Sequence, residues 1–80
     1  PYSVQVNSYD NKNDADKRIE RLRQIGYESF SYPAFVDAKD RTYFRVYVGR
    51  YQDLQSARKA CEDLKKKGDF ESDIFVVKRY

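Results

Sequence analysis

Two stretches of the chain alternate apolar and polar residues, and a helical pattern follows each of them. Val4-x-Val6 and Val46-x-Val48 have the two-residue period of a strand that is buried on one face. After each stretch, apolar residues recur every three or four positions, as on the buried side of an amphipathic helix. These residues are Ala15, Ile19 and Leu22 in the first half and Ala57, Cys61 and Leu64 in the second. The pattern predicts two strand–helix units.

The two units repeat each other at an offset of 42 residues, which carries Val4 to Val46. The same offset carries Asn11 to Asp53, and both residue types are favourable helix N-caps. It also carries Gly26 to Gly68, where the end of each helix favours a residue with positive φ. Equivalent positions therefore carry equivalent structural signals, which indicates an internal repeat.

Each predicted helix is followed by another strand-like segment. The first covers residues 29–36, and Pro33 within it favours the edge of a sheet; the second covers residues 74–78. Residues 37–41 are a polar connection between the halves. The order β-α-β-β-α-β predicts an α+β fold of the ferredoxin-like or RNP-like type, with a four-stranded antiparallel sheet and both helices on one face. Right-handed crossovers place the first and third strands in the middle.

Length and composition narrow the class of protein. Eighty residues, 40% hydrophobic and 36% charged, are typical of one globular domain. Because residues 1–80 begin directly with a strand, we expect a single domain taken from a longer protein. No apolar run approaches the ~18 residues of a membrane span, and no signal-peptide pattern is present. One cysteine allows no internal disulfide, and the lack of histidine disfavours an ordinary zinc site.

The net charge of +3 and the pI near 9.1 fit an anionic partner. The electrostatic field of the chain is weak, however, because this charge is spread over 80 residues. The only basic run, residues 65–67, falls at the end of the second predicted helix, where the helix dipole favours cations. We interpret this run as a solvated helix end rather than a phosphate-binding patch.

One face of the predicted sheet has no helix to cover it. The residues that alternate with core positions on the two central strands turn toward this face. They are Ser3, Gln5 and Asn7 on the first strand and Tyr43, Arg45 and Tyr47 on the third. Tyrosine rings can stack on a ligand, the arginine fork suits a carboxylate or phosphate, and the amides donate and accept hydrogen bonds. We interpret the face as a binding surface; the alternative is ordinary cross-strand aromatic pairing.

Two segments resemble the signatures of SPOR (sporulation-related) domains. Residues 2–9, Tyr-Ser-Val-Gln-Val-Asn-Ser-Tyr, are similar to that family's aromatic-x-Val-Gln-Val-Gly-Ser-aromatic motif. Residues 43–51, Tyr-Phe-Arg-Val-Tyr-Val-Gly-Arg-Tyr, are similar to its Tyr-x-Arg-Val-x-Val-Gly-Pro-aromatic motif. The chain departs from the family at Asn7, where glycine is usual, and at Arg50, where proline is usual. Asparagine, like glycine, tolerates unusual backbone angles.

The resemblance implies a non-catalytic module of the bacterial cell envelope, in the periplasm or the cell wall. Such a module binds peptidoglycan, prefers glycan strands without stem peptides, and directs its parent protein to the division septum. Gln5, Ser8, Tyr43 and Arg45 match the family's glycan-contacting positions. Together with the outward residues of the central strands, they make up the expected glycan site: Gln5, Asn7, Ser8, Tyr43, Arg45 and Tyr47. We expect no cofactor, no metal and no membrane insertion, and we keep single-stranded RNA binding only as the alternative function.

RNA binding and catalysis are two alternative classes of function. RNA-recognition motifs share this element order and stack bases on central-strand aromatics, but residues 41–48 lack the two glycines of their third-strand motif. Gln5 also stands where those domains have an aromatic residue. An enzyme is disfavoured because Cys61, the one thiol, has no histidine to activate it. Residues 10–14 resemble the start of a calcium-binding loop, but Lys12 stands where an oxygen ligand is needed. Ala15 stands where the loop needs glycine, and Arg21 stands where it needs a bidentate glutamate.

Overall fold

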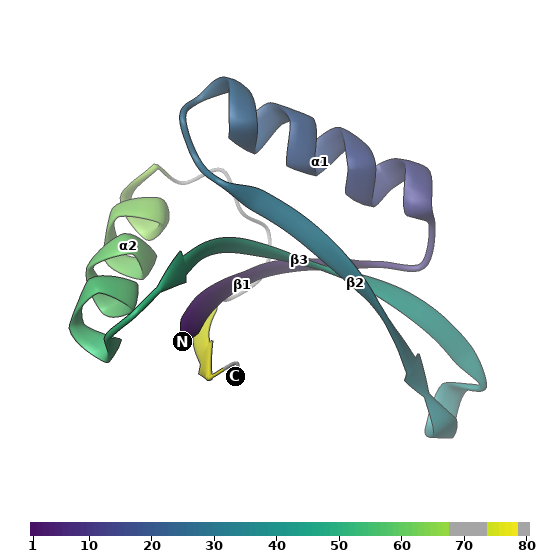
Figure 1. The fold of residues 1–80 in the computed structure, drawn as a ribbon. Coiled ribbons are helices and arrows are strands. Elements are labelled where there is room, and N and C mark those ends of the chain that lie inside the picture. Colours follow the sequence, from purple (N-terminus) through teal and green to yellow (C-terminus); the bar gives the residue numbers. More distant parts are fainter. Residues whose placement is uncertain (68–73, 79–80) are drawn as a thin grey trace.

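The computed structural model describes residues 1–67 and 74–78 (Figure 1). Their elements follow the predicted order of strands and helices. They are β1 (Tyr2–Tyr9), α1 (Lys12–Gln24), β2 (Ser29–Val36), the short 3-10 helix η1 (Asp37–Lys39), β3 (Arg41–Tyr51), α2 (Leu54–Lys66) and β4 (Phe75–Lys78). The described strands form one antiparallel sheet in the order β2-β3-β1-β4. The prediction is confirmed: β1 and β3 are central, and β2, which contains Pro33, lies at an edge.

Both helices cover the same face of the sheet (Figure 1). α1 packs on β1, β2 and β3, whereas α2 packs on β1, β3 and β4. The strands arch across the molecule, and the face away from the helices is concave (Figure 1). We call this second face the open face. No helix of the described residues lies over it, so its side chains meet solvent, one another or a ligand.

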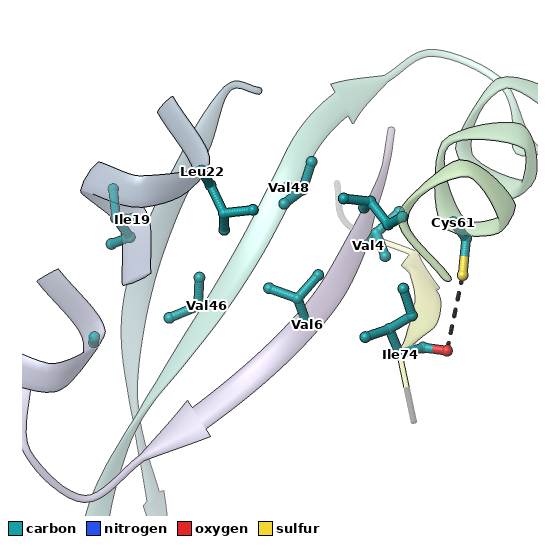
Figure 2. Close-up of a cluster of buried hydrophobic side chains, with 10 residues drawn as sticks. Val4, Val6, Ile19, Leu22, Val46, Val48, Cys61 and Ile74 are labelled. Atoms are coloured by element: carbon teal, nitrogen blue, oxygen red, sulfur yellow. Dashed lines mark hydrogen bonds between the residues drawn. The ribbon is translucent and has the colours of Figure 1, made fainter. Parts of the chain in front are cut away.

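The hydrophobic core lies between the helices and the sheet (Figure 2). It takes alternate residues from the central strands and one residue per turn from each helix. Its members are Val4, Val6, Ala15, Ile19, Leu22, Val46, Val48, Cys61, Leu64 and Ile74. The Cys61 thiol is buried and donates a 3.8 Å hydrogen bond to the carbonyl oxygen of Ile74. Cys61 is therefore a packing residue of α2.

The internal repeat is visible in the way the helices begin. The Asn11 side chain accepts a 2.7 Å hydrogen bond from the Asn13 amide, and Asp53 accepts one of 2.8 Å from the Ser56 amide. Both residues are the N-caps predicted from the sequence. After α1, Gly26 adopts a φ of +100°, as predicted. Its counterpart Gly68 lies outside the described residues.

Two β-bulges interrupt the pairing of β1 with β3, and the repeat relates them. One lies between Gln5 and Asn7, where β1 has the extra residue; the other lies opposite Ser3, where β3 has the extra residue at Gly49. Asn7 and Gly49 are equivalent under the 42-residue offset. A bulge shifts the in-and-out alternation of all residues beyond it. Each central strand therefore changes which side chains it turns to the open face near its C-terminal end.

Leu22 is 1% exposed and anchors the last turn of α1 in the core. Leu22→Ala removes this contact and leaves a cavity, so we expect it to lower the free energy of unfolding by about 3 kcal/mol. Ile25, the C-cap of the same helix, is 53% exposed. Ile25→Ala is the control and should change stability by less than about 0.5 kcal/mol in chemical denaturation. Equal losses in the two variants would contradict the assignment of the core.

Asp53 makes the start of α2 sensitive to acid. Hydrogen bonds from the backbone amide and then the hydroxyl of Ser56 hold the pKa of this carboxyl below its ordinary value of 3.8. The unfolded chain therefore binds the proton more tightly, and the stabilisation is lost as the pH falls below that value. We expect the thermal midpoint of Asp53→Asn to depend less on pH between 5 and 2 than that of the wild type. If the thermal midpoints of the two proteins fall in parallel as the pH is lowered, Asp53 is not a source of acid sensitivity.

Candidate functional site

An aromatic cluster occupies the middle of the open face. Phe30 and Tyr32 come from β2 and Tyr47 from β3, and the pairing register places Phe30 opposite Tyr47. The Phe30 and Tyr47 rings stack with centroids 5.8 Å apart, and Tyr32 lies 5.6 Å from Phe30 and 6.1 Å from Tyr47. Tyr47 is only 7% exposed, whereas Tyr32 is 42% exposed. Tyr47 therefore supports the cluster from below, and Tyr32 presents a ring surface to solvent.

A first depression of about 300 Å³, which we call the hairpin depression, lies beside the β2–β3 connection. Its lining residues come from β1, β2, η1 and β3. They are Ser8, Val36, Lys39, Tyr43 and Arg45. The register pairs Ser8 directly with Arg45, because the bulge in β1 turns Ser8 to the open face. Tyr43 lies two residues before Arg45 on β3 and shares its face of the strand.

Positive charge dominates the hairpin depression. The Lys39 ammonium group lies 5.6 Å from the centroid of the Tyr43 ring, a cation–π distance. Neither Lys39 nor Arg45 forms an ion pair with another residue in the described part of the chain. The nearby Arg41 differs, since its guanidinium group is paired with Asp10 at 3.3 Å. The depression therefore offers a guanidinium fork and an ammonium group to an anionic ligand, next to an aromatic ring.

A second depression, also of about 300 Å³, lies toward the other end of β3. We call it the aromatic depression because Phe30 and Tyr32 form part of its wall. Its lining residues are Pro1, Tyr2, Ser3, Phe30, Tyr32, Arg50 and Gln52. Ser3 is 2% exposed, and its hydroxyl donates a 2.7 Å hydrogen bond to the Gly49 carbonyl oxygen at the bulge. Ser3 thus ties the end of β1 to the bulge of β3.

The structure places five of the six predicted site residues on the open face, in three situations. Ser8, Tyr43 and Arg45 line one depression. Gln5 pairs with Tyr47 on one side and with Phe75, which is 50% exposed, on the other. Gln5 therefore lies on the open face, with β3 on one side and β4 on the other. Tyr47 lies on the same face but is covered by its aromatic neighbours.

The expectation that Asn7 faces outward is wrong. The bulge pairs Asn7 with Val46, a core residue that faces the helices, and the Asn7 Oδ1 atom is buried without a hydrogen bond to any described residue. Among described residues other than glycine, only Asp40 has a positive φ, so Asn7 does not use the left-handed conformation that its motif position suggested. Ser3, also expected to face solvent, is buried against the second bulge.

Sequence reasoning missed Phe30, Tyr32 and Arg50. In residues 29–32 the serines alternate with the aromatic residues, and such a pattern would ordinarily place the aromatic rings in the core. The structure reverses this, because the Ser29 hydroxyl faces inward and donates a 2.9 Å hydrogen bond to the Tyr47 carbonyl oxygen. To predict that Arg50 faces the open face, one would have had to know of the bulge at Gly49.

Two other kinds of site are absent from the described residues. Within residues 1–67 and 74–78, no group of three or more histidine, cysteine or acidic side chains is placed to hold a metal ion. In the same residues, no helix has the length and apolar character needed to cross a membrane.

Comparisons with known proteins identify the family. The model of the SPOR domain matches residues 1–76, and the chain therefore belongs to the SPOR-domain family. This family consists of peptidoglycan-binding modules associated with the bacterial cell envelope, and its members bind rather than catalyse.

Among solved structures, the chain is similar to the crystal structure of the RlpA SPOR domain from Pseudomonas aeruginosa. The TM-score is 0.77 at 12% sequence identity, and the match covers 99% of this chain and 100% of that one. At this identity the likeness establishes the fold. No match was found among curated proteins.

Gly49 makes the bulge in β3 possible, because its φ is +77° and a Cβ atom there would overlap the Tyr51 ring. Gly49→Ala should lower the free energy of unfolding by about 2 kcal/mol or more, through backbone strain and the displaced ring. Gly26 is a matched control: its φ is +100°, but no atom lies within 4 Å of an added Cβ. Gly26→Ala should therefore lower the free energy of unfolding, measured by chemical denaturation, by less than Gly49→Ala does. A larger loss at Gly26 would argue against a structural role for the second bulge.

Proposed function

We propose that this chain binds peptidoglycan strands from which the stem peptides have been removed, and that it directs its parent protein to the division septum, where such strands are enriched. The observation that carries the proposal is Arg45. Its side chain shares a depression with Ser8 and Tyr43 and has no ion-pair partner among the described residues.

Removal of a stem peptide leaves a free lactyl carboxylate on the sugar. A guanidinium group can bind a carboxylate through two parallel hydrogen bonds, which gives Arg45 a reason to prefer the stripped strand. Lys39, at the same depression, adds a second positive charge. An intact strand replaces the carboxylate with a neutral amide and adds a bulky peptide, so both charge and space disfavour it.

The neighbouring residues supply the sugar contacts. Tyr43 offers a ring to the apolar C–H face of a sugar, and Ser8 and Gln5 offer hydrogen bonds to hydroxyl and N-acetyl groups. Asn7 and Tyr47, which the sequence also suggested, lie behind this surface and support it from the core and from the aromatic cluster. Because the depression is open and shallow, little of the ligand is desolvated, and modest affinity per module follows.

The experiment is co-sedimentation of the purified domain with intact and with amidase-treated sacculi. The wild type should be retained more strongly on the treated wall. Arg45→Ala and Tyr43→Ala should each weaken that retention about tenfold, since each removes a contact worth roughly 1.5 kcal/mol. Arg58→Ala is the matched control, because Arg58 is an exposed arginine on α2. It removes the same charge from the other side of the molecule and should bind like the wild type.

Wild-type binding by both folded site variants would remove Tyr43 and Arg45 from the site. Retention on poly-U with a steep loss of binding in added salt would instead favour single-stranded RNA, because phosphate contacts release counterions. A stripped glycan, with one carboxylate for every two sugars, carries fewer charges than RNA and should show a shallower salt dependence.

A further inference from the structure

We propose that the aromatic depression is a second half of the binding site, related to the hairpin depression by the internal repeat, and that one glycan strand spans both. The proposal rests on the glycan binding proposed above and adds Arg50 as its second anion contact.

The repeat relates the arginine–serine pairs of the two depressions. The 42-residue offset carries Ser3 to Arg45 and Ser8 to Arg50. The hairpin depression contains Arg45 with Ser8, and the aromatic depression contains Arg50 with Ser3. Each depression thus combines one arginine of β3 with one serine of β1. Because β1 and β3 are antiparallel and carry equivalent bulges, the equivalent pairs lie at opposite ends of the open face.

Arg50 is held in position but remains accessible. Its guanidinium carbon lies 4.4 Å from the centroid of the Phe30 ring, and its Nε lies 3.2 Å from Oε2 of Glu28. Phe30 is itself stacked on Tyr47, so the arginine rests on a fixed aromatic surface. The Arg50 side chain is nevertheless 61% exposed. Glu28 approaches Nε, and no described residue is hydrogen-bonded to the two terminal nitrogens, which can bind a ligand oxygen.

The spacing of the two arginines determines the size of the ligand. Arg50 lies five positions after Arg45 on β3, which corresponds to roughly 16 Å between their Cα atoms along an extended strand. The two arginines line different depressions, so a ligand that contacts both must extend from one depression to the other, as an oligosaccharide can. In a stripped strand the lactyl carboxylates recur on every second sugar, so one strand can place a carboxylate at each end. Tyr32, which is paired with Arg45 and also lines the aromatic depression, provides a ring surface between them.

Arg50 also distinguishes this chain from the motif it resembles, in which this position is usually proline. A proline cannot supply a cation, so the second half of the site depends on this substitution. The predicted consequence is a stronger dependence of affinity on glycan length than one depression alone would produce, because the second contact is made within an already bound strand.

The experiment compares two ligands that carry free lactyl carboxylates: one disaccharide repeat, and strands of at least three repeats. For the wild type, the strands should bind at least tenfold more tightly than the disaccharide. Arg50→Ala should weaken strand binding about tenfold while disaccharide binding stays within about twofold, since the hairpin depression is intact. Arg45→Ala should weaken both ligands. Arg58→Ala again serves as the charge control on α2, and its binding should not change.

The outcomes separate this proposal from the one on which it rests. Wild-type strand binding by Arg50→Ala, together with a loss in Arg45→Ala, would overturn the second half-site and leave the glycan site intact. Failure of the wild type to bind either ligand would overturn both. Glu28→Gln removes the Arg50 ion pair without removing the cation, so strand binding by this variant should be equal to or tighter than that of the wild type. A tenfold loss in Glu28→Gln would mean that Arg50 acts through its partner rather than on the ligand.

Discussion

The antiparallel pairing of β1 with β3 controls which side chains of this protein can meet a ligand. Both strands are central, so every residue on them faces either the helices or the open face. Each strand carries one bulge, and each bulge reverses the alternation beyond it. Ser8 and Arg50 reach the open face for this reason, and Tyr9 and Tyr51 pack against the core for the same reason. The set of side chains on the open face is thus a consequence of backbone register.

The two faces of the sheet differ in what covers their side chains. On the helix side, small and branched apolar residues pack two helices onto the strands with little exposed area. On the open side, three aromatic rings cover the middle of the sheet and leave Tyr47 nearly buried without any helix above it. The depressions lie to either side of this cluster. Side chains at their rims can therefore change with little effect on the core, which suits a module whose task is binding.

The likeness to the RlpA SPOR domain shows how little residue identity the fold requires. Twelve per cent identity accompanies a match over nearly the whole chain. A short β-α-β unit, used twice, needs apolar residues at the right period, a capped helix start and a turn at the helix end. Many sequences meet these conditions, so residues outside these positions can vary while the fold is kept.

The sequence by itself determined the order of the elements, both helix N-caps, the internal repeat, the edge position of β2, and the outward orientation of Tyr43 and Arg45. These features follow from local periodicity and from residue-specific backbone preferences, which are present in any short segment of chain. Only the tertiary structure decided that Asn7 faces the helices, that Ser3 is buried, that Tyr47 lies beneath Phe30 and Tyr32, and that Arg50 reaches the open face. Bulges and cross-strand neighbours depend on how two distant strands pair, and the period within one strand carries no information about that register.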